Sequence, residues 1–367
     1  MESKVKWVKL GAYIEPCDER NTDLSISLSQ GISNMKFFQD PKQVSVNSKS
    51  DKIVRKGQFA YNRATTRNGE KISIAYREGE DCTVSSAYQI FRIKDERVLN
   101  PHYLMLWFKR PEFDRYARYM SKGSAHEFFE YSDMEDVEIP LPSPEEQQKV
   151  VNVWKACKEI KEQNEAKAAP LMQLCQSYIQ ELKHKYPAQE IGPYVHRIDE
   201  RNSDKSIKEV RSVSVTKDFN ETNAKVDKNN LSNYKIVREN QISFVQTTGN
   251  EKCLCAAINH LGFPVVVTSV NEVFETDENY LIADYLHMIF RRKETDRYAR
   301  FHSWGSARET FTWEDMKRFS IPLPPPDVQR AIVNIYKCAN EAKQIAAEAD
   351  KLSREVCPAL LQHIINS

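Results

Sequence analysis

The stretch Asp114-Arg115-Tyr116-Ala117-Arg118 occurs a second time as Asp296-Arg297-Tyr298-Ala299-Arg300, 182 residues later. The same offset continues without a gap to Ile139-Pro140-Leu141-Pro142, which returns as Ile321-Pro322-Leu323-Pro324. Solenoid proteins repeat every 20 to 50 residues or so, and this period is far longer. The chain therefore contains two domain-sized copies of one module, and tandem binding modules indicate a target with two parts.

Composition agrees with a folded protein of this organisation. A length of 367 residues predicts about two to three domains. Hydrophobic residues at 40% and charged residues at 29% are typical of soluble globular chains. The chain shows neither an apolar run of about 18 residues nor the apolar stretch of a signal peptide, so we expect a cytoplasmic protein with no membrane partner.

The 8 cysteines are scattered, without a Cys-x-x-Cys pair or a histidine at metal-binding spacing. They predict free thiols in a reducing compartment and no metal site. The net charge of +1 does not by itself indicate a nucleic-acid partner, so any basic surface must be local.

The two copies share a frame and differ in between. Asp18-Glu19-Arg20-Asn21 returns as Asp199-Glu200-Arg201-Asn202, and Lys52-Ile53-Val54-Arg55 returns as Lys235-Ile236-Val237-Arg238. After these anchors, residues 61–71 of the first copy face an unrelated polar segment, 244–252, in the second. Two modules with one frame and different polar inserts could carry two different recognition surfaces.

Hydrophobic patterning predicts strands and one helix in each module. In the first copy the strands are expected at 58–61, 71–76 and 88–93, and their counterparts at 242–245, 253–258 and 265–268. Asn100-Pro101 is typical of a helix start, with proline at the first helical position. The expected fold class is α+β, with two repeated mixed modules that are richer in strand in their first two-thirds.

A long helix is predicted after each module. Ser143-Pro144-Glu145-Glu146 forms a capping box at the start of the first helix. Both helices then carry a heptad-like seam with steps of three and four. The seam residues are Val150, Val153, Cys157, Ile160, Asn164, Lys167, Leu171, Leu174 and Tyr178, and then Ile332, Ile335, Ala339, Ala342, Ala346, Ala349, Ser353, Val356 and Leu360.

A helix of about 40 residues is about 60 Å long and cannot bury such a seam alone. Because a folded module separates the two helices, an antiparallel coiled coil is the expected arrangement, and packing of each helix on its own domain is the alternative. Pro170 and Pro358 are expected to kink or end the helices. The predicted segments are two modules at 1–142 and 188–324 and two long helices at 143–187 and 325–367.

A family resemblance is carried by the duplicated Ile-Pro-Leu-Pro segments and the helix starts that follow them, Ser143-Pro144-Glu145-Glu146-Gln147 and Pro325-Pro326-Asp327-Val328-Gln329. The whole chain resembles the specificity (S) subunit of type I restriction–modification systems. The resemblance implies that the modules at 1–142 and 188–324 are target recognition domains, that each reads one half of a split DNA sequence, and that the helices at 143–187 and 325–367 are spacer helices. It also implies that the paired helices act as a ruler and dock two methyltransferase (M) subunits, and that restriction/motor (R) subunits join the complex.

Motifs for catalysis are missing from the sequence, which favours a non-catalytic subunit. With only 10 glycines, the chain has no Gly-x-Gly loop after a strand for S-adenosylmethionine, and it has no P-loop. Asn100-Pro101-His102-Tyr103 approaches the adenine methyltransferase motif but departs from it at the third position, and we interpret it as a helix cap. S-adenosylmethionine, ATP and Mg²⁺ are therefore expected on partner subunits, with no cofactor in this chain.

A first group of candidate DNA contacts follows the opening repeat. Arg115, Arg118 and Lys122 are spaced for one helix face that could lie along phosphates, or could be a solvated face with ion pairs. Arg297, Arg300 and Trp304 occupy the same positions in the second copy. The next loops resemble the family's Gly-Ser/Thr loop near DNA, although the family's usual glutamine is missing, and they supply Ser124, His126, Ser306 and Arg308. Arg308 could bind guanine, and His126 could face a base or a phosphate or be an ordinary surface histidine.

The divergent inserts supply the second group. Arginine pairs well with guanine and asparagine or glutamine with adenine, but a polar loop without any partner is the alternative. The residues are Asn62, Arg63, Thr65, Thr66, Arg67, Asn68 and Lys71 in the first copy, and Gln246, Thr247, Thr248, Asn250 and Lys252 in the second.

Two other functions stay open at this point. A self-contained DNA-modifying enzyme with fused recognition domains would methylate or cleave DNA when given magnesium and S-adenosylmethionine. A helical scaffold joining two proteins would be indifferent to DNA, whereas a DNA-binding subunit would lose DNA as salt rises.

Overall fold

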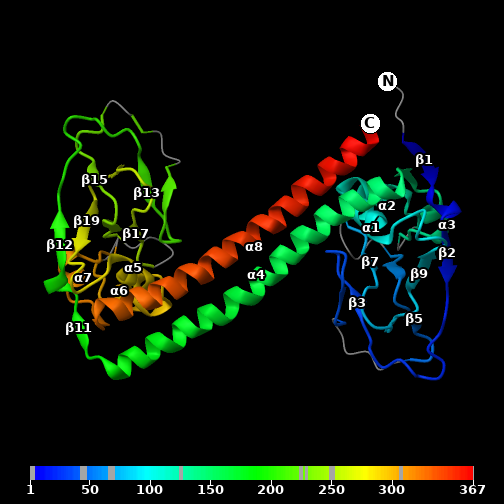
Figure 1. Cartoon of the computed structure of the whole chain (residues 1–367), viewed down its shortest axis with the longest axis horizontal. Coiled ribbons are helices and arrows are strands. Elements are labelled where there is room, and N and C mark those ends of the chain that lie inside the picture. Colours follow the sequence, from blue (N-terminus) through cyan, green and yellow to red (C-terminus); the bar gives the residue numbers. More distant parts are fainter. Residues whose placement is uncertain are drawn as a thin grey trace. The chain divides into compact units, whose positions relative to one another are not determined.

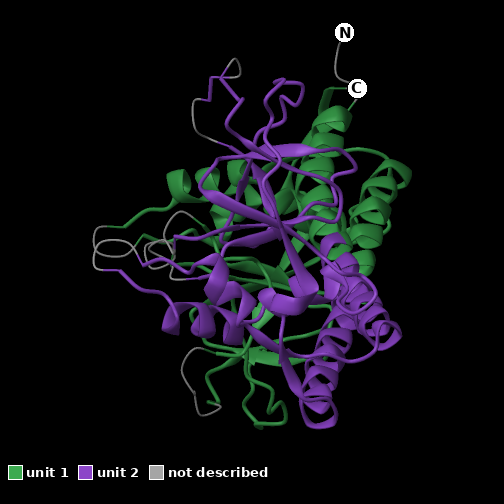
Figure 2. Cartoon of the chain, turned by 90° about the vertical axis from the view of Figure 1, so that its left-hand side faces the viewer, with its two compact units in different colours: residues 1–163, 345–367 green, residues 164–344 purple. Residues whose placement is uncertain are grey.

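The structure is a computed structural model that describes residues 5–41, 48–64, 71–123, 127–222, 226–227, 230–247, 253–305 and 309–366. The chain forms two compact units (Figure 2), one of residues 1–163 with 345–367 and the other of residues 164–344. Each unit thus takes part of both long helices, so the units cut across the four segments predicted from the sequence.

The first unit is built around an antiparallel sheet of four strands in the order β2-β9-β6-β7. The described residues of this unit also form the two-stranded sheets β1-β10, β3-β4 and β5-β8. Strands β1, β3 and β5 of these sheets are labelled in Figure 1. The elements are β1 (Lys6–Lys9), β2 (Ile14–Cys17), β3 (Gly31–Ile32), β4 (Phe38–Gln39), β5 (Lys52–Val54), β6 (Gln58–Asn62), β7 (Ile74–Tyr76), β8 (Cys82–Val84), β9 (Tyr88–Ile93), α1 (Pro101–Phe108), α2 (Pro111–Met120), α3 (Tyr131–Glu135), β10 (Glu138–Leu141) and the first part of α4 (Pro144–Lys185), with a 3₁₀ turn at Leu10–Ala12.

The second unit repeats this topology strand for strand. Its four-stranded sheet has the order β12-β19-β16-β17, and its pairs are β11-β20, β13-β14 and β15-β18. The elements are β11 (Ala188–Glu190), β12 (Val195–Ile198), β13 (Arg211–Val213), β14 (Phe219–Glu221), β15 (Lys235–Val237), β16 (Ile242–Val245), β17 (Ala256–Ile258), β18 (Val265–Val267), β19 (Asn271–Thr276), α5 (Ala283–Phe290), α6 (Lys293–Phe301), α7 (Trp313–Lys317), β20 (Ser320–Pro322) and the first part of α8 (Pro326–Asn366), with a 3₁₀ turn at Gly192–Tyr194.

Most predicted strands are confirmed, and one assignment between the copies is wrong. The counterpart of β9 is β19, because both are the inner strand beside the central β6 or β16. The segment predicted for that role, 265–268, forms β18 and pairs with β15, as β8 pairs with β5. The apolar run of three valines is a strand, but it belongs to a smaller sheet.

Each unit has a core of aromatic side chains packed between its sheet and its short helices. In the first unit the Phe59 ring stacks on Phe91 with centroids 5.0 Å apart, and Phe108 of α1 meets both rings edge-on. Phe244 and Phe274 occupy the same strands of the second unit at 6.2 Å. All five rings are fully buried.

The start of α1 confirms the interpretation of Asn100 as a helix cap. Its side chain accepts hydrogen bonds from the backbone of His102 and Tyr103. Pro101 then occupies the first helical position, as predicted.

The glutamine that follows the capping sequence joins each long helix to its module. Gln147 is fully buried, accepts a hydrogen bond from Asn100 N (2.8 Å) and donates to Val98 O (2.9 Å) and Pro142 O (3.0 Å). Gln329 makes the same three bonds, to Ile282 N (2.9 Å), Tyr280 O (2.7 Å) and Pro324 O (2.8 Å). This bonding explains why the motif needs glutamine at this position, since only an amide supplies both an acceptor and two donors here.

The two long helices pair antiparallel within each unit. In the first unit Val150, Val151 and Trp154 of α4 share a core with Cys357 and Leu361 of α8. In the second unit Cys175, Ile179 and Leu182 of α4 share a core with Ile332 and Val333 of α8. Helix lengths of 42 and 41 residues confirm the prediction of about 40.

The seam is correct throughout α8 and half correct in α4. Every predicted α8 position is buried or half-buried. In α4, Val153, Ile160 and Leu174 are exposed, and so is Lys167. The buried seam steps by four and then three from Val150, through Trp154, Cys157, Lys161, Asn164, Ala168, Leu171, Cys175, Tyr178 and Leu182.

Neither proline ends its helix, since Pro170 and Pro358 both lie inside continuous helices.

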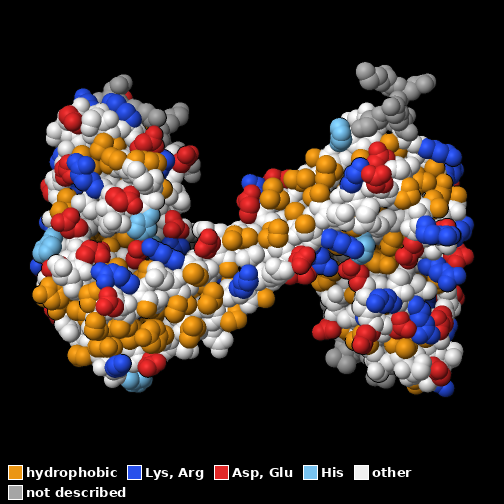
Figure 3. All heavy atoms as spheres, viewed as in Figure 1, with side chains coloured by type: hydrophobic (Ala, Val, Ile, Leu, Met, Phe, Trp, Pro, Cys, Tyr) orange, Lys and Arg blue, Asp and Glu red, His pale blue; other side chains and the backbone are white. Residues whose placement is uncertain are grey.

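No helix in the described part of the chain is long and apolar enough to cross a membrane. On the face drawn in Figure 3, basic and acidic side chains alternate over both units, in keeping with a net charge of +1.

Candidate nucleic-acid interface

In the first unit the structure brings the ends of the two predicted reading segments together. β6 ends at Asn62, and the carbonyl of Arg63 accepts a hydrogen bond from Phe129 N at 2.9 Å. Lys122 and Phe128 exchange two backbone hydrogen bonds, of 3.1 and 2.9 Å, and Ala64 forms a β-bridge with Phe128. The segment entering the divergent insert and both ends of the Gly-Ser loop therefore lie on one small patch of sheet.

The second unit repeats the arrangement. The carbonyl of Gln246 accepts from Phe311 N at 2.8 Å, and Thr247 forms a β-bridge with Thr310. Trp304 and Thr310 exchange backbone hydrogen bonds of 3.2 and 2.9 Å. The two groups of candidate residues, which are far apart in the sequence, thus form one candidate interface in each module.

The side chains at the entry to the inserts already have partners. Arg63 binds Glu130 (Nη1–Oε2 3.2 Å) and lies over the Phe128 ring at 6.0 Å from its centroid. Gln246 donates to Glu272, and the Asn62 side chain accepts from Ala64 N at 3.1 Å, as in a tight turn. To contact a base, Arg63 must give up its bond to Glu130, and Gln246 must give up its bond to Glu272.

Glu272 is held by more than Gln246. Burial alone would raise its pKa, but hydrogen bonds from Arg197 (2.6 and 2.9 Å) and Lys235 (3.0 Å) outweigh this and lower the pKa. Its carboxylate therefore stays charged and fixes the end of β16 against β19.

The predicted basic helices exist, but one of the expected face residues lies outside its helix. Arg115 and Arg118 lie on exposed positions of α2, and Arg297 and Arg300 on exposed positions of α6. α2 ends at Met120, because Ser121 turns to an extended backbone (ψ 133°) and its hydroxyl bonds the Ala117 carbonyl at 2.6 Å. Lys122, predicted on the helix face, therefore belongs to the bridge with Phe128, and Trp304 occupies the same place in the second unit.

Glycine is required where each Gly-Ser loop begins. Gly123 has φ 145° and Gly305 has φ 139°, values that side chains with a Cβ rarely adopt. The repeated glycine therefore sets the direction in which the chain leaves the bridge.

The remaining candidates lie outside the described residues. They are Thr65, Thr66, Arg67, Asn68, Ser124, His126, Thr248, Asn250, Lys252, Ser306 and Arg308. Lys71, on the downstream side of the first insert, is described and exposed.

A buried lysine–aspartate pair joins the downstream end of each insert to its basic helix. Lys36 Nζ lies 2.7 Å from Asp114 Oδ1 of α2, and the same oxygen accepts a hydrogen bond from Ile72 N at 3.2 Å. Lys36 also donates to the carbonyl of Phe108 at the end of α1. The pKa of Lys36 is lowered by burial, which the pairing with Asp114 opposes.

The second unit has the same connection. Lys217 Nζ lies 2.6 Å from Asp296 Oδ1, which accepts from Leu254 N at 3.1 Å, and Lys217 donates to Phe290 O. Lys36 and Lys217 share the unusual backbone angle φ 66°. This connection was not predicted, because its members are separated by tens of residues and only their repetition at equivalent positions could have indicated them.

Two exposed aromatic side chains at the ends of the basic helices were also missed. Tyr119 closes the exposed face of α2 and is 86% exposed, and Phe301 ends α6 and is 80% exposed. They occupy equivalent positions in the opening repeat, and that equivalence was the available signal. Trp304, at 76% exposure, lies three residues beyond Phe301.

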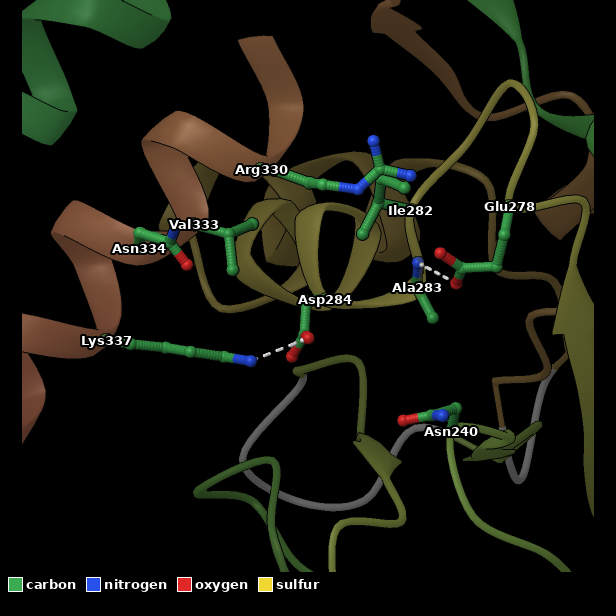
Figure 4. A pocket seen from close by; sticks show the side chains of 9 residues that line it. All are labelled: Asn240, Glu278, Ile282, Ala283, Asp284, Arg330, Val333, Asn334 and Lys337. Carbon is green, nitrogen blue, oxygen red and sulfur yellow. Dashed lines mark hydrogen bonds and ion pairs between the residues drawn. The ribbon is translucent and has the colours of Figure 1, made fainter. Parts of the chain in front are cut away.

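A pocket in the second unit lies between α5 and α8, and charged side chains that line it are bonded to other lining residues (Figure 4). Lys337 binds Asp284 at 2.7 Å, and Glu278 accepts from Ala283 N at 2.9 Å. His260 also binds Asp284, at 2.8 Å. Burial would raise the pKa of Asp284, but hydrogen bonds from His260 and Lys337 lower it to about 2.

The first unit has a similar cluster, in which the acidic residue and the histidine have exchanged positions. Glu78 faces His102 of α1 at 3.8 Å and binds Lys158 of α4 at 3.3 Å. Acidic, histidine and lysine side chains thus meet at the same junction in both units. This junction is a contact between module and helix, and we assign no ligand to it.

One family model matches the part of the chain that contains the first candidate interface. The family model for the "Type I restriction modification DNA specificity domain" matches residues 34–168, which include the first candidate interface. Residues 34–168 are therefore similar to the DNA specificity domain of type I restriction–modification systems. The match covers β4 to α4 and ends within the long helix, and the internal repeat extends the same frame to the second unit.

Solved structures add the fold of the whole chain. The S subunit of a type I restriction–modification system from M. genitalium superposes with a TM-score of 0.63 at 12% identity, over 99% of this chain and 97% of that one. The HsdS subunit from Thermoanaerobacter tengcongensis matches at 16% identity over 100% and 98% of the two chains, with a TM-score of 0.42. A chain from a structure of type I R-M complex assembly matches at 14% identity over 99% and 98%, with a TM-score of 0.39.

No curated protein matches the chain. The family model confirms the predicted resemblance over residues 34–168, and the M. genitalium subunit shares the fold of the whole chain.

Proposed function

We propose that the chain is a non-catalytic specificity subunit that reads a bipartite DNA motif, one half with each unit. The observation that carries the proposal is that each unit brings the entry to its divergent insert and both ends of its Gly-Ser loop onto one patch beside a basic helix. Frame residues are the same in both copies and insert residues differ, as two half-sites of different sequence require.

The exposed arginines of α2 and α6 suit contacts with phosphate, which position a protein on DNA without reading sequence. The inserts and Gly-Ser loops beside them would supply the base contacts. This division predicts that arginine variants weaken binding to all sequences, whereas insert variants change the sequence that is bound.

Partner subunits complete the proposed complex. Two methyltransferase subunits and restriction/motor subunits would supply S-adenosylmethionine, ATP and Mg²⁺ chemistry. The apolar side chains of α4 that lie outside its seam support a docking role for this helix, because Val153 is 36% exposed and Leu174 is 51% exposed. Exposed apolar side chains on a helix are suited to contact with another protein.

The test is to map N6-methyladenine in cells that express the chain with a methyltransferase subunit. A split motif is expected, and exchange of residues 52–131 for those of another specificity subunit should change one half and keep the other. The purified chain alone should neither methylate nor cleave DNA. Activity of the isolated chain, or a motif that changes in both halves, would contradict the proposal.

A further inference from the structure

Each unit ends its basic helix in a ring that projects into solvent. Tyr119 and Phe301 are 182 residues apart, the offset of the repeat, and both are at least 80% exposed. A single exposed aromatic residue needs no explanation in a soluble protein. The same exposure at one position of both copies, beside inserts that differ, indicates a shared use.

Charge around the rings identifies the kind of partner. Arg115 and Arg297 lie one helical turn before the rings on the same face and are 71% and 72% exposed. Their ion pairs with Glu112 and Glu294 are long, at 3.3 and 3.7 Å, and lie in solvent, where such pairs contribute little. An exposed ring beside a guanidinium group fits a partner that combines phosphate with flat apolar groups.

The rings are also continuous with the candidate interface. Ser121 bonds back to Ala117 at 2.6 Å, and Ser303 bonds back to Ala299 at 2.6 Å, so both helix ends are fixed. These serines lead directly into the bridges formed by Lys122 and Trp304. The chain thus passes within three residues from the ring to the loops proposed to read bases.

We propose that Tyr119 and Phe301 are stacking contacts of the two units with DNA, each ring inserted against a base pair that is unstacked at the edge of its half-site while the neighbouring arginines bind phosphates. The inference rests on the proposed function and adds a contact that is independent of sequence. Phenylalanine has no hydrogen-bonding group, so the shared contact is made by the ring face, which tolerates every base.

The experiment measures binding of the full chain to duplex DNA of mixed sequence by fluorescence anisotropy over a series of salt concentrations. A ring stacked on a base contributes about 1–3 kcal/mol in single-strand complexes, and the cost of unstacking a duplex step offsets part of this gain. Tyr119→Ala and Phe301→Ala should therefore each weaken binding by about 5-fold, the lower end of that range. The slope against salt should stay unchanged, because no phosphate contact is lost. Arg115→Ala should instead reduce that slope by about 1.

Two control variants separate the ring from its volume and from folding. Tyr119→Phe keeps the ring face and should bind within about twofold of wild type, because exposed substitutions cost at most about 0.5 kcal/mol. Tyr119→Leu keeps an apolar side chain without a ring and should behave like Tyr119→Ala. Thermal unfolding of all variants should match wild type.

Wild-type DNA binding with unchanged affinity in both alanine variants would overturn the inference and leave the proposed function intact. Loss of methyltransferase binding by these variants with unchanged DNA binding would overturn it too, in favour of a protein contact. A wild-type chain indifferent to DNA at every salt concentration would overturn the inference and the proposed function together.

Discussion

Removing the carboxylate of Asp114 should destabilise the first unit more than removing the whole lysine–aspartate pair. Lys36 is 5% exposed and Asp114 is 10% exposed, so Asp114→Ala leaves an ammonium group buried without its counter-charge. Breaking a buried pair in this way costs about 3–5 kcal/mol. The same variant also removes the acceptor for Ile72 N, which adds to the cost because a buried unpaired donor is unfavourable.

The double variants divide this cost into charge and hydrogen bonding. Lys36→Met with Asp114→Asn leaves no buried charge and keeps an oxygen for Ile72 N, so the loss should stay within about 1–3 kcal/mol. Lys36→Met with Asp114→Leu removes that oxygen as well and should fall between this variant and Asp114→Ala.

Unfolding in urea gives the free energies, and hydrogen exchange followed by mass spectrometry assigns them to a unit. The peptide around Ile72 should exchange faster in Asp114→Ala, while the peptide around Leu254 in the second unit should exchange as in wild type. A loss below about 1 kcal/mol, or equal exchange at Ile72 in all variants, would refute the reasoning, because a buried uncompensated ammonium must be costly.

Three further predictions concern the frame, the histidines and the helix pair. Gln147→Leu strips three buried backbone groups of their partners and should cost about 3 kcal/mol or more in urea unfolding, since each unpaired group costs about 1–3 kcal/mol. The pKa of His260 is raised by its hydrogen bond to Asp284 and that of His287 is lowered to about 4 by burial, so NMR titration should find the first above its ordinary value and the second near 4. His260 therefore stabilises the fold fully below pH of about 6.5, and this contribution is lost as pH rises through its folded pKa, whereas buried neutral His287 destabilises it as pH falls below about 6.5. Seven residues added after Lys161 and at the matching point of α8 preserve the heptad seam and lengthen the helices by about 10 Å, so the mapped DNA motif should gain about three base pairs of spacer and keep both half-sites.

The helices show what hydrophobic patterning can and cannot predict. The α8 seam is correct at each position, because its alanines leave a single face on which close helix packing is possible. In α4 the exposed Val153, Ile160 and Leu174 are apolar, while the buried seam contains Lys161, which is paired with Asp350 at 2.8 Å. A pattern based on apolarity alone selects the wrong alternative when a lysine in the seam has a partner on another helix.

The sequence predicted the segments that form the candidate site, but it did not predict the bonds that hold these segments together. The repeat located the divergent inserts, the basic helices and the Gly-Ser loops. The bonds that bring them together, such as those of Phe129 to Arg63 and of Asp114 to Ile72, join residues far apart in the sequence. β19 was missed because the three valines of β18 are the stronger strand signal, although the shift of 183 residues from Lys52 to Lys235 carries 88–93 onto Asn271–Thr276.

The duplicated glutamine contact has an evolutionary consequence. Gln147 and Gln329 bind their modules through backbone groups alone, and Tyr103 and Tyr285 bind the backbone carbonyls of Pro140 and Pro322 at 3.1 and 2.9 Å. A connection made to backbone is indifferent to the side chains that an insert carries. Recombination between the two repeats, or with a related gene, can therefore replace one insert and leave these frame contacts in place. Under the proposed function, a new DNA specificity would then arise in one step without a new fold.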